Sequence, residues 1–245
     1  MFCIKRMLQV ALLALSTVGI MLPASSFAGD VADREIIGFS ADGGYFAFEQ
    51  YGYQDGSGFP YSEIFVIDTE RNAWVGGSPF EVLIKDEKGS LEEARTQSRT
   101  KAAALLSEHG INVQGRILAS NPVTELSANP KRVEVNPESN VANIVAPILV
   151  KLRTFSLESP LCRTFTQDPI LGFQLTIGQK GQRAATVHKD DRIPKSRGCP
   201  LRYAIRDVIR YRRRNYTVYI VLISVFQHGF EGPDVRYIAV PYREF

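Results

Sequence analysis

The sequence is 245 residues long, with 44% hydrophobic and 22% charged residues and a formal net charge of +3. A chain of this length can bury a substantial core without help from metals or many disulfides. Its near-zero net charge argues against a general nucleic-acid-binding protein, because such a protein needs a marked positive surplus.

The start of the chain has the three regions of a cleavable export signal. A basic stretch precedes an apolar run at residues 8–23, and the small residues Ser26 and Ala28 stand three and one positions before the expected cleavage. The alternative is a retained membrane anchor, but the run is shorter than the roughly 20 residues of a spanning helix. We therefore expect cleavage between Ala28 and Gly29 and a secreted, most simply periplasmic, mature chain without a transmembrane span.

Removal of the signal leaves 217 residues with 27 basic and 26 acidic side chains, a net charge of +1. We expect residues 29–245 to form a single mainly β domain. Two cysteines remain, Cys162 and Cys199, and a lone pair in an oxidising compartment is most simply a disulfide. The alternative is a redox or metal-binding thiol pair, although neither cysteine lies in a C-x-x-C motif.

Residues 35–68 predict three strands joined by two turns. Asp42 and Gly43 separate two apolar alternating runs, which is a strong hairpin signal, and residues 64–68 (IFVID) follow a glycine-rich turn. With a short strand after it, the unit at 35–75 resembles one blade of the TolB-type β-propeller repeats, whose pattern is F-S-P-D-G, an apolar strand and I-Y-V-I-D. The resemblance implies a propeller-like architecture and brings no catalytic group. No internal repeat of the unit is found, so a regular propeller is not supported.

A long surface helix is expected at residues 91–109. Ser90 and Glu93 form a capping box before it, and Gly110 supplies the left-handed residue after it. A narrow stripe of small and apolar residues is expected to face a sheet, and the opposite face to meet solvent. The solvent face comprises Glu92, Arg95, Arg99 and Glu108.

The rest of the chain returns to period-two patterns broken by prolines. Further strands are expected at residues 114–119, 132–136, 148–157, 173–177, 184–188, 216–226 and 237–241. The run at 216–226 is apolar on both faces, as in a central strand, and 201–209 fits helix or strand. The predicted fold is mainly β, with antiparallel sheets in a sandwich-like or irregular propeller-like arrangement and one long surface helix.

Two groups of motifs bracket nearly the whole mature chain. The first comprises Phe46–Gly52, Asp55–Gly58 and Pro60–Ser62, and the second comprises His228–Asp234 and Tyr237–Pro241. Together they resemble a family of predicted secreted bacterial proteins of unknown function. The resemblance implies export and a β-rich fold, and it implies no activity for any residue.

Tyrosines around the glycine-rich turn are the first candidate binding residues. Tyr51, Tyr53 and Tyr61 surround that turn, where they can line a recognition surface or pack as cross-strand pairs. The three histidines complete no recognisable metal-ligand set, and no nucleotide-binding or hydrolase motif is present. We expect neither a metal nor another cofactor.

A basic stretch supplies the second group of candidates. Residues 189–214 carry a local net charge of +7, against −6 for the rest of the mature chain. Such a separation can create a positive face for polyanions or anionic lipid head groups. Alternatively, the arginines are solvated or paired with acids, and the last three form a hairpin tip. The residues proposed for this face are Tyr203, Arg206, Arg210, Tyr211, Arg212, Arg213 and Arg214.

Two functions are consistent with these patterns. The first is a non-catalytic binding or protein-interaction module of the envelope or periplasm, with another envelope protein or an anionic envelope component as partner. The alternative is an exported hydrolase that uses His228 with Glu231 or Asp234, because a histidine near carboxylates suits general-base catalysis. The absence of a catalytic constellation favours the binding module.

Overall fold

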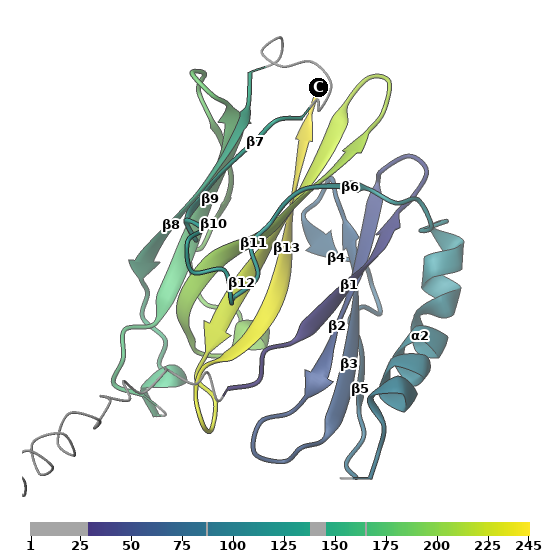
Figure 1. Cartoon of the computed structure of the whole chain (residues 1–245), viewed down its shortest axis with the longest axis vertical. Helices are drawn as coiled ribbons and strands as arrows, with labels where there is room; N and C mark the ends of the chain where they lie inside the picture. The colour runs from purple at the N-terminus through teal and green to yellow at the C-terminus, as the bar shows by residue number, and fades with distance from the viewer. Residues whose placement is uncertain (1–28, 87, 138–145, 165) are drawn as a thin grey trace, which may run out of the picture.

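The structure is a computed structural model that describes residues 29–86, 88–137, 146–164 and 166–245. The expected export signal, including Ala28, lies outside the described residues. Three antiparallel β-sheets stack face to face, and one long helix covers the outer face of one sheet (Figure 1). The mainly β fold with one long helix is therefore confirmed.

The first layer, called the N-terminal sheet, has the strand order β1-β2-β3-β4, and β5 also pairs with β3. Its strands are β1 (Asp33–Phe39), β2 (Tyr45–Tyr53), β3 (Pro60–Asp68), β4 (Ala73–Trp74) and β5 (Phe80–Leu83). Helix α2 (Leu91–Glu108) lies on its outer face, on the right of Figure 1.

The central sheet has the order β13-β12-β11-β6, and the outer sheet has the order β10-β9-β8-β7. The strands of the central sheet are β6 (Arg116–Ser120), β11 (Pro200–Arg212), β12 (Thr217–Gln227) and β13 (Asp234–Glu244). Those of the outer sheet are β7 (Arg132–Val135), β8 (Ile148–Ser156), β9 (Leu171–Gln179) and β10 (Ala185–Lys189). Two short 3₁₀ turns, η2 (Cys162–Thr164) and η3 (Lys195–Arg197), lie in the connections.

Strand β12 lies between two hydrophobic cores, which confirms the prediction of a central strand. Because side chains alternate across a strand, successive residues of β12 enter different cores. Tyr219, Val221, Ile223 and Val225 pack toward the outer sheet. Val218, Ile220, Leu222 and Phe226 pack toward the N-terminal sheet.

Strand β11 settles the ambiguity of residues 201–209. This segment pairs antiparallel with β12 on one side and with β6 on the other. The β-branched residues Ile205, Val208 and Ile209 are buried there, and such side chains suit a pleated, buried surface. The segment is therefore a strand, not a helix.

Both predicted ends of helix α2 are confirmed. The Ser90 hydroxyl accepts a hydrogen bond from the backbone N–H of Glu93 at 3.0 Å. At the other end Gly110 has φ of 58°, and its N–H and that of Ile111 donate to the carbonyls of Ser107 and Leu106. These two bonds define a Schellman motif, which requires the left-handed residue that glycine tolerates.

The expected solvent face of the helix is wrong at Arg95, which is mostly buried, whereas Arg99 is half exposed. Both guanidinium groups contact the carboxylate of Glu49, a fully buried residue of β2. A buried carboxylate is costly unless it is paired and hydrogen-bonded. The two guanidinium groups therefore reach down to the sheet, while both side chains keep part of their surface in solvent, Arg99 more than Arg95.

The resemblance to a propeller blade is not confirmed. Strands β1 to β4 do form an up-and-down meander, and the Asp42–Gly43 turn joins β1 to β2 as predicted. However, propeller blades are arranged radially around a channel. Here the meander lies flat against the central sheet and shares a core with it.

Candidate functional site

A cleft of about 450 Å³ opens beside β13, the edge strand of the central sheet. Cavities of a few hundred cubic ångströms are typical of ligand sites. One wall comes from the N-terminal sheet and the other from the end of β10 and the segment 190–198. The lining includes Glu63, Trp74 and Glu81 on the first wall, and His188, Ser196 and Arg197 on the second.

The first wall carries two carboxyl groups at opposed positions. Glu63 of β3 and Glu81 of β5 are register partners in the antiparallel pair. Burial raises the pKa of Glu63, and the neighbouring charge of Glu81 adds to that rise, while a hydrogen bond from Gln50 opposes it. Like charges directly opposite each other are unfavourable in a sheet, so this wall is suited to a group that donates hydrogen bonds or carries positive charge.

The aromatic side chain of Trp74 completes the first wall, and Arg236 of β13 lies next to this wall. Trp74 is 45% exposed and packs against Phe65, with ring centroids 5.5 Å apart. Arg236 lies over the ring of Tyr61 at 4.6 Å, and its guanidinium donates to the carboxylate of Asp30 at 2.5 Å. The cation at this wall therefore already has an internal counter-ion, whereas Trp74 presents an apolar face to the cleft.

The second wall is anchored by Asp190, which is almost fully buried. One carboxylate oxygen lies 2.8 Å from His188 Nε2, and the other accepts from Arg197 at 2.7 Å and from the Phe173 N–H at 2.8 Å. Burial by itself raises the pKa of Asp190, but the hydrogen bonds from His188, Arg197 and Phe173 outweigh it and hold the pKa below its usual range. The carboxylate thus fixes two of the cleft residues of this wall, His188 and Arg197.

The predicted surface position of Tyr203 is wrong. Tyr203 is completely buried, its ring lies 4.8 Å from that of Phe173, and its hydroxyl accepts from Arg197 at 3.4 Å. Burial raises its pKa to about 12. The tyrosine is part of the core between the central and outer sheets, because its position on β11 points inward.

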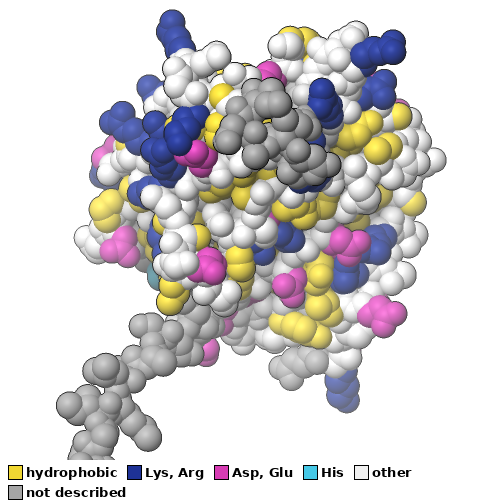
Figure 2. Space-filling model, turned by 45° about the horizontal axis from the view of Figure 1, so that its top comes forward, with side chains coloured by type: hydrophobic (Ala, Val, Ile, Leu, Met, Phe, Trp, Pro, Cys, Tyr) yellow, Lys and Arg dark blue, Asp and Glu magenta, His cyan; other side chains and the backbone are white. Residues whose placement is uncertain are grey.

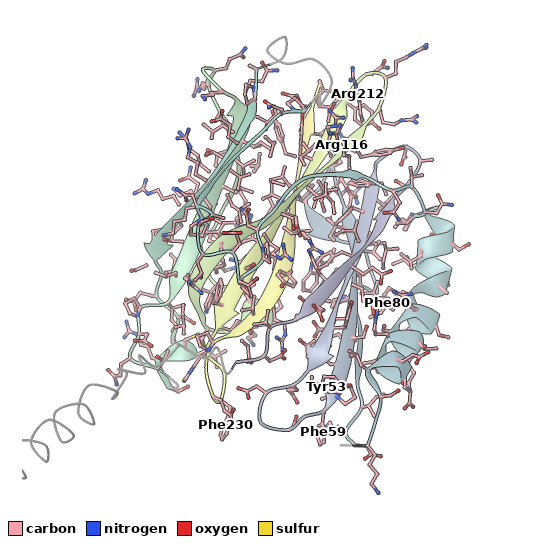
Figure 3. All side chains as sticks on the ribbon, in the orientation of Figure 1. Tyr53, Phe59, Phe80, Arg116, Arg212 and Phe230 are labelled. Carbon is pink, nitrogen blue, oxygen red and sulfur yellow. A yellow bond between two sulfur atoms is a disulfide. The ribbon has the colours of Figure 1, made fainter. Side chains whose placement is uncertain are left out.

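The other predicted tyrosines differ in their surroundings. Tyr61 is 5% exposed and donates to Asp30, and Tyr51 lies under the guanidinium of Arg95 at 3.8 Å. Tyr53 is 52% exposed and lies at the end of the molecule where Phe59 and Phe230 also project (Figure 3). The packing interpretation therefore applies to Tyr61, whereas Tyr53 is accessible to a partner.

The basic stretch does not form one face. Arg206 donates to Ser120 and pairs with Asp207, while Arg210 donates to the carbonyl of Pro137. Tyr211 stacks on Phe39 and donates to the carbonyl of Ala41.

Strand length separates the two ends of this stretch. Arg197 lies in η3, shortly before the 13-residue strand β11, and at about 3.3 Å per residue the strand carries the chain some 40 Å away. Arg213 and Arg214 are exposed at the β11–β12 turn, and Arg212 lies at the same end, opposite Phe230 (Figure 3). Figure 2 shows basic side chains in several separate groups, with acidic side chains among them.

The residues of the hydrolase hypothesis lie outside the cleft, which is lined by none of His228, Glu231 and Asp234. His228 and Glu231 are exposed, and the Asp234 carboxylate accepts from the N–H of Asp30. The N–H of Glu231 donates to Asp55, whose carboxylate ties this loop to the glycine-rich turn. These contacts are those of a hydrogen-bonded turn.

The disulfide between Cys162 and Cys199 is confirmed, with the two Cα atoms 5.5 Å apart. It joins the connection after β8 to the start of β11. No group of three or more potential metal ligands occurs in the described parts of the chain. Within those same parts, no helix has the length and apolar character needed to cross a membrane.

Sequence reasoning missed the residues that form the cleft. Glu63, Trp74, His188 and Ala239 are distant in the sequence and meet only because the sheets stack. The spacing of His188 and Asp190 was the available signal, since residues two apart share a face of an extended segment. A histidine two residues from an aspartate is common in strands, so this spacing indicates a site only where a cavity lies beside it.

These features define a mainly β protein with a disulfide and an edge-strand cleft. Residues 47–243 match the family model described as "Predicted secreted protein (DUF2259)". The chain belongs to this family, which confirms the resemblance found in the sequence. Neither a curated protein nor a solved structure matches the chain.

Proposed function

We propose that this protein is an exported, non-catalytic binding module of the periplasm that holds its ligand in the cleft beside β13. The observation that carries the proposal is the cleft itself, which combines an exposed Trp74, opposed carboxyls and a hydrogen-bonded His188. Apolar surface with a few fixed polar groups is the usual composition of a ligand site.

Two further observations support export and binding. The family is described as predicted secreted proteins, and the Cys162–Cys199 disulfide suits an oxidising compartment. Of the two expected partner classes, the opposed Glu63 and Glu81 favour another envelope protein over an anionic envelope component, because like charges repel.

Site-specific photocrosslinking in cells tests the proposal. The photoreactive amino acid p-benzoylphenylalanine is placed at Trp74 or at Ser196, one on each wall of the cleft. The control position is Leu126, which is 92% exposed in the β6–β7 connection, away from the cleft. We expect adducts from both cleft positions that are not formed from Leu126. The same adducts from all three positions, or none from the cleft, would contradict a ligand site there.

A further inference from the structure

The outer edge of β13 carries backbone groups that no strand covers. Near its start, the Val235 N–H donates to Asp30 O at 2.7 Å and the Val235 carbonyl accepts from the Ala32 N–H at 3.1 Å. Val235 therefore directs its backbone polar groups away from β12. In an antiparallel pair this direction recurs at every second residue, so Tyr237, Ala239 and Pro241 also face the outer edge.

These outward groups line the cleft over a short stretch. The Tyr237 N–H donates to the side-chain oxygen of Gln50 at 2.7 Å. For the Tyr237 carbonyl and for the N–H and carbonyl of Ala239, the described residues supply no hydrogen-bond partner on the outer side. Pro241, which has no N–H, ends the available edge. Tyr237 and Ala239 both line the cleft, so three backbone groups are open to a ligand.

We propose that this edge binds an extended peptide of a partner protein as an additional β-strand of the central sheet. The inference rests on the proposed function and specifies the chemistry of the ligand at the same cleft. Backbone groups at a free strand edge are the usual template for such strand addition. The chain already uses this edge once, because Val31 forms a parallel bridge with Val235 directly beside the cleft.

The two walls specify the side chains of that peptide. An added strand continues the pleat of β13, so its side chains alternate between the N-terminal and outer sheets. Those on the first side meet Glu63, Glu81 and the face of Trp74, which together favour a lysine or arginine. Those on the other side meet Pro194, Ile238 and Val240, which favour aliphatic side chains. The ligand is therefore an extended segment of alternating basic and aliphatic residues.

Fluorescence anisotropy with synthetic peptides on the purified mature protein tests this inference. The probe is an acetylated and amidated heptapeptide of alternating lysine and valine. A glutamate–valine peptide of the same length controls for charge, and a lysine–valine peptide with N-methyl groups on its central residues controls for backbone pairing. We expect saturable binding of the first peptide, none of the second, and about tenfold weaker binding of the third, since one or two backbone hydrogen bonds are lost.

Two variants locate the contact on the protein. Glu63→Gln/Glu81→Gln removes both carboxylates and should weaken the lysine–valine peptide about fivefold, a modest effect because the charges are partly hydrated. Ala239→Pro removes the central N–H and should weaken binding about tenfold, as N-methylation of the peptide does. Circular dichroism shows whether each variant is folded. The N-methylated peptide gives the same information without any change to the protein, so the test does not depend on Ala239→Pro folding.

The results separate this inference from the proposed function. Equal binding of the N-methylated and unmodified peptides, or binding unaffected by Glu63→Gln/Glu81→Gln, overturns strand addition of a basic peptide. Failure of the lysine–valine peptide to bind overturns it as well. In each case the proposed binding function still stands if the photoreactive residue at Trp74 and at Ser196 forms adducts that are absent at Leu126. Those adducts require only that a ligand occupies the cleft.

Discussion

The carboxylate of Glu49, on strand β2, lies 2.8 Å from Nε of Arg95 on helix α2 and is completely buried beneath that helix. Arg99 donates to the same carboxylate at 2.8 Å, and the Ser62 hydroxyl donates to it at 2.9 Å. The helix is therefore attached to the N-terminal sheet through charge-assisted hydrogen bonds as well as through small residues such as Ala94 and Ala102.

Glu49→Gln should lower the free energy of unfolding by about 2 kcal/mol. Removal of one partner of a fully buried pair costs about 3–5 kcal/mol. The loss expected here is smaller because Arg95 and Arg99 reach solvent, where water can stabilise their charges. Urea denaturation measures the difference. The matched control is Glu35→Gln, since Glu35 contacts the same two arginines but is 46% exposed, and its effect should stay within about 0.5 kcal/mol. Equal effects of both substitutions would contradict the special position of Glu49.

The effect of Glu49→Gln should depend on pH. Burial by itself raises the pKa of Glu49, but the hydrogen bonds from Arg95, Arg99 and Ser62 outweigh it and hold the pKa below its usual range. A carboxyl with a lowered folded pKa contributes stability above its unfolded pKa and loses it as pH falls through the folded value. The difference between wild type and variant should therefore be constant above about pH 5 and shrink under more acidic conditions.

Local signals in the sequence predicted the ends of helix α2 and the position of β12. These signals depend only on residues that are close in the chain, so they can be recognised without knowledge of the fold. They are the helix caps at Ser90 and Gly110 and the apolar run at 216–226. The disulfide was also predictable, because the compartment and the count of cysteines left few alternatives.

Long-range contacts explain what could not be predicted. The inward turn of Arg95 depends on Glu49, which is 46 residues away in the chain. The burial of Tyr203 depends on how the outer sheet stacks on the central one. The cleft requires the edge of β13 to lie between two walls from distant segments, an arrangement that no local pattern specifies.

Cys162→Ala/Cys199→Ala should lower the free energy of unfolding by about 4 kcal/mol. The disulfide closes a loop with a sequence separation of 37, and in the chain-entropy model a loop of this size stabilises by about that amount. Urea denaturation of the oxidised wild type and of the variant measures the difference. Wild type unfolded in the presence of a reductant should match the variant; an unchanged midpoint in either experiment would contradict a stabilising bridge.

The exported protein should begin at Gly29. The N–H of Asp30 donates to Asp234 at 3.0 Å, and its carboxylate accepts from Arg236, so the chain is held against β13 from this point onward. A Cβ atom on residue 29 would lie 2.3 Å from the Pro233 carbonyl oxygen, so any other residue there would clash with the backbone. Intact-mass spectrometry of the secreted form should give residues 29–245. A mature form that lacks Asp30, or one that starts at Met1, would contradict this prediction.

Asp190→Asn should destabilise the protein by about 3 kcal/mol and disorganise the second wall of the cleft. Asp190 is the counter-ion of Arg197, whose side chain is 9% exposed, and an uncompensated buried charge costs about 3–5 kcal/mol. The substitution also replaces one of the two carboxylate oxygens with an amide NH2 group, so the contacts to His188 and to Arg197 cannot both be kept. Chemical denaturation measures the stability, and crosslinking from Ser196 reports on the wall.

The neighbouring Asp191 provides the matched control for this change. Asp191 is exposed, so Asp191→Asn removes the same charge one position away and should alter stability by no more than about 0.5 kcal/mol. The lowered pKa of Asp190 adds a second criterion. The carboxylate contributes its full stabilisation above the pKa that it has in the unfolded chain, and this stabilisation disappears as pH falls through its pKa in the folded protein. The difference between Asp190→Asn and wild type should therefore diminish in acid, while Asp191→Asn shows no comparable trend. Similar behaviour of the two variants would mean that the buried carboxylate does not hold this wall of the cleft.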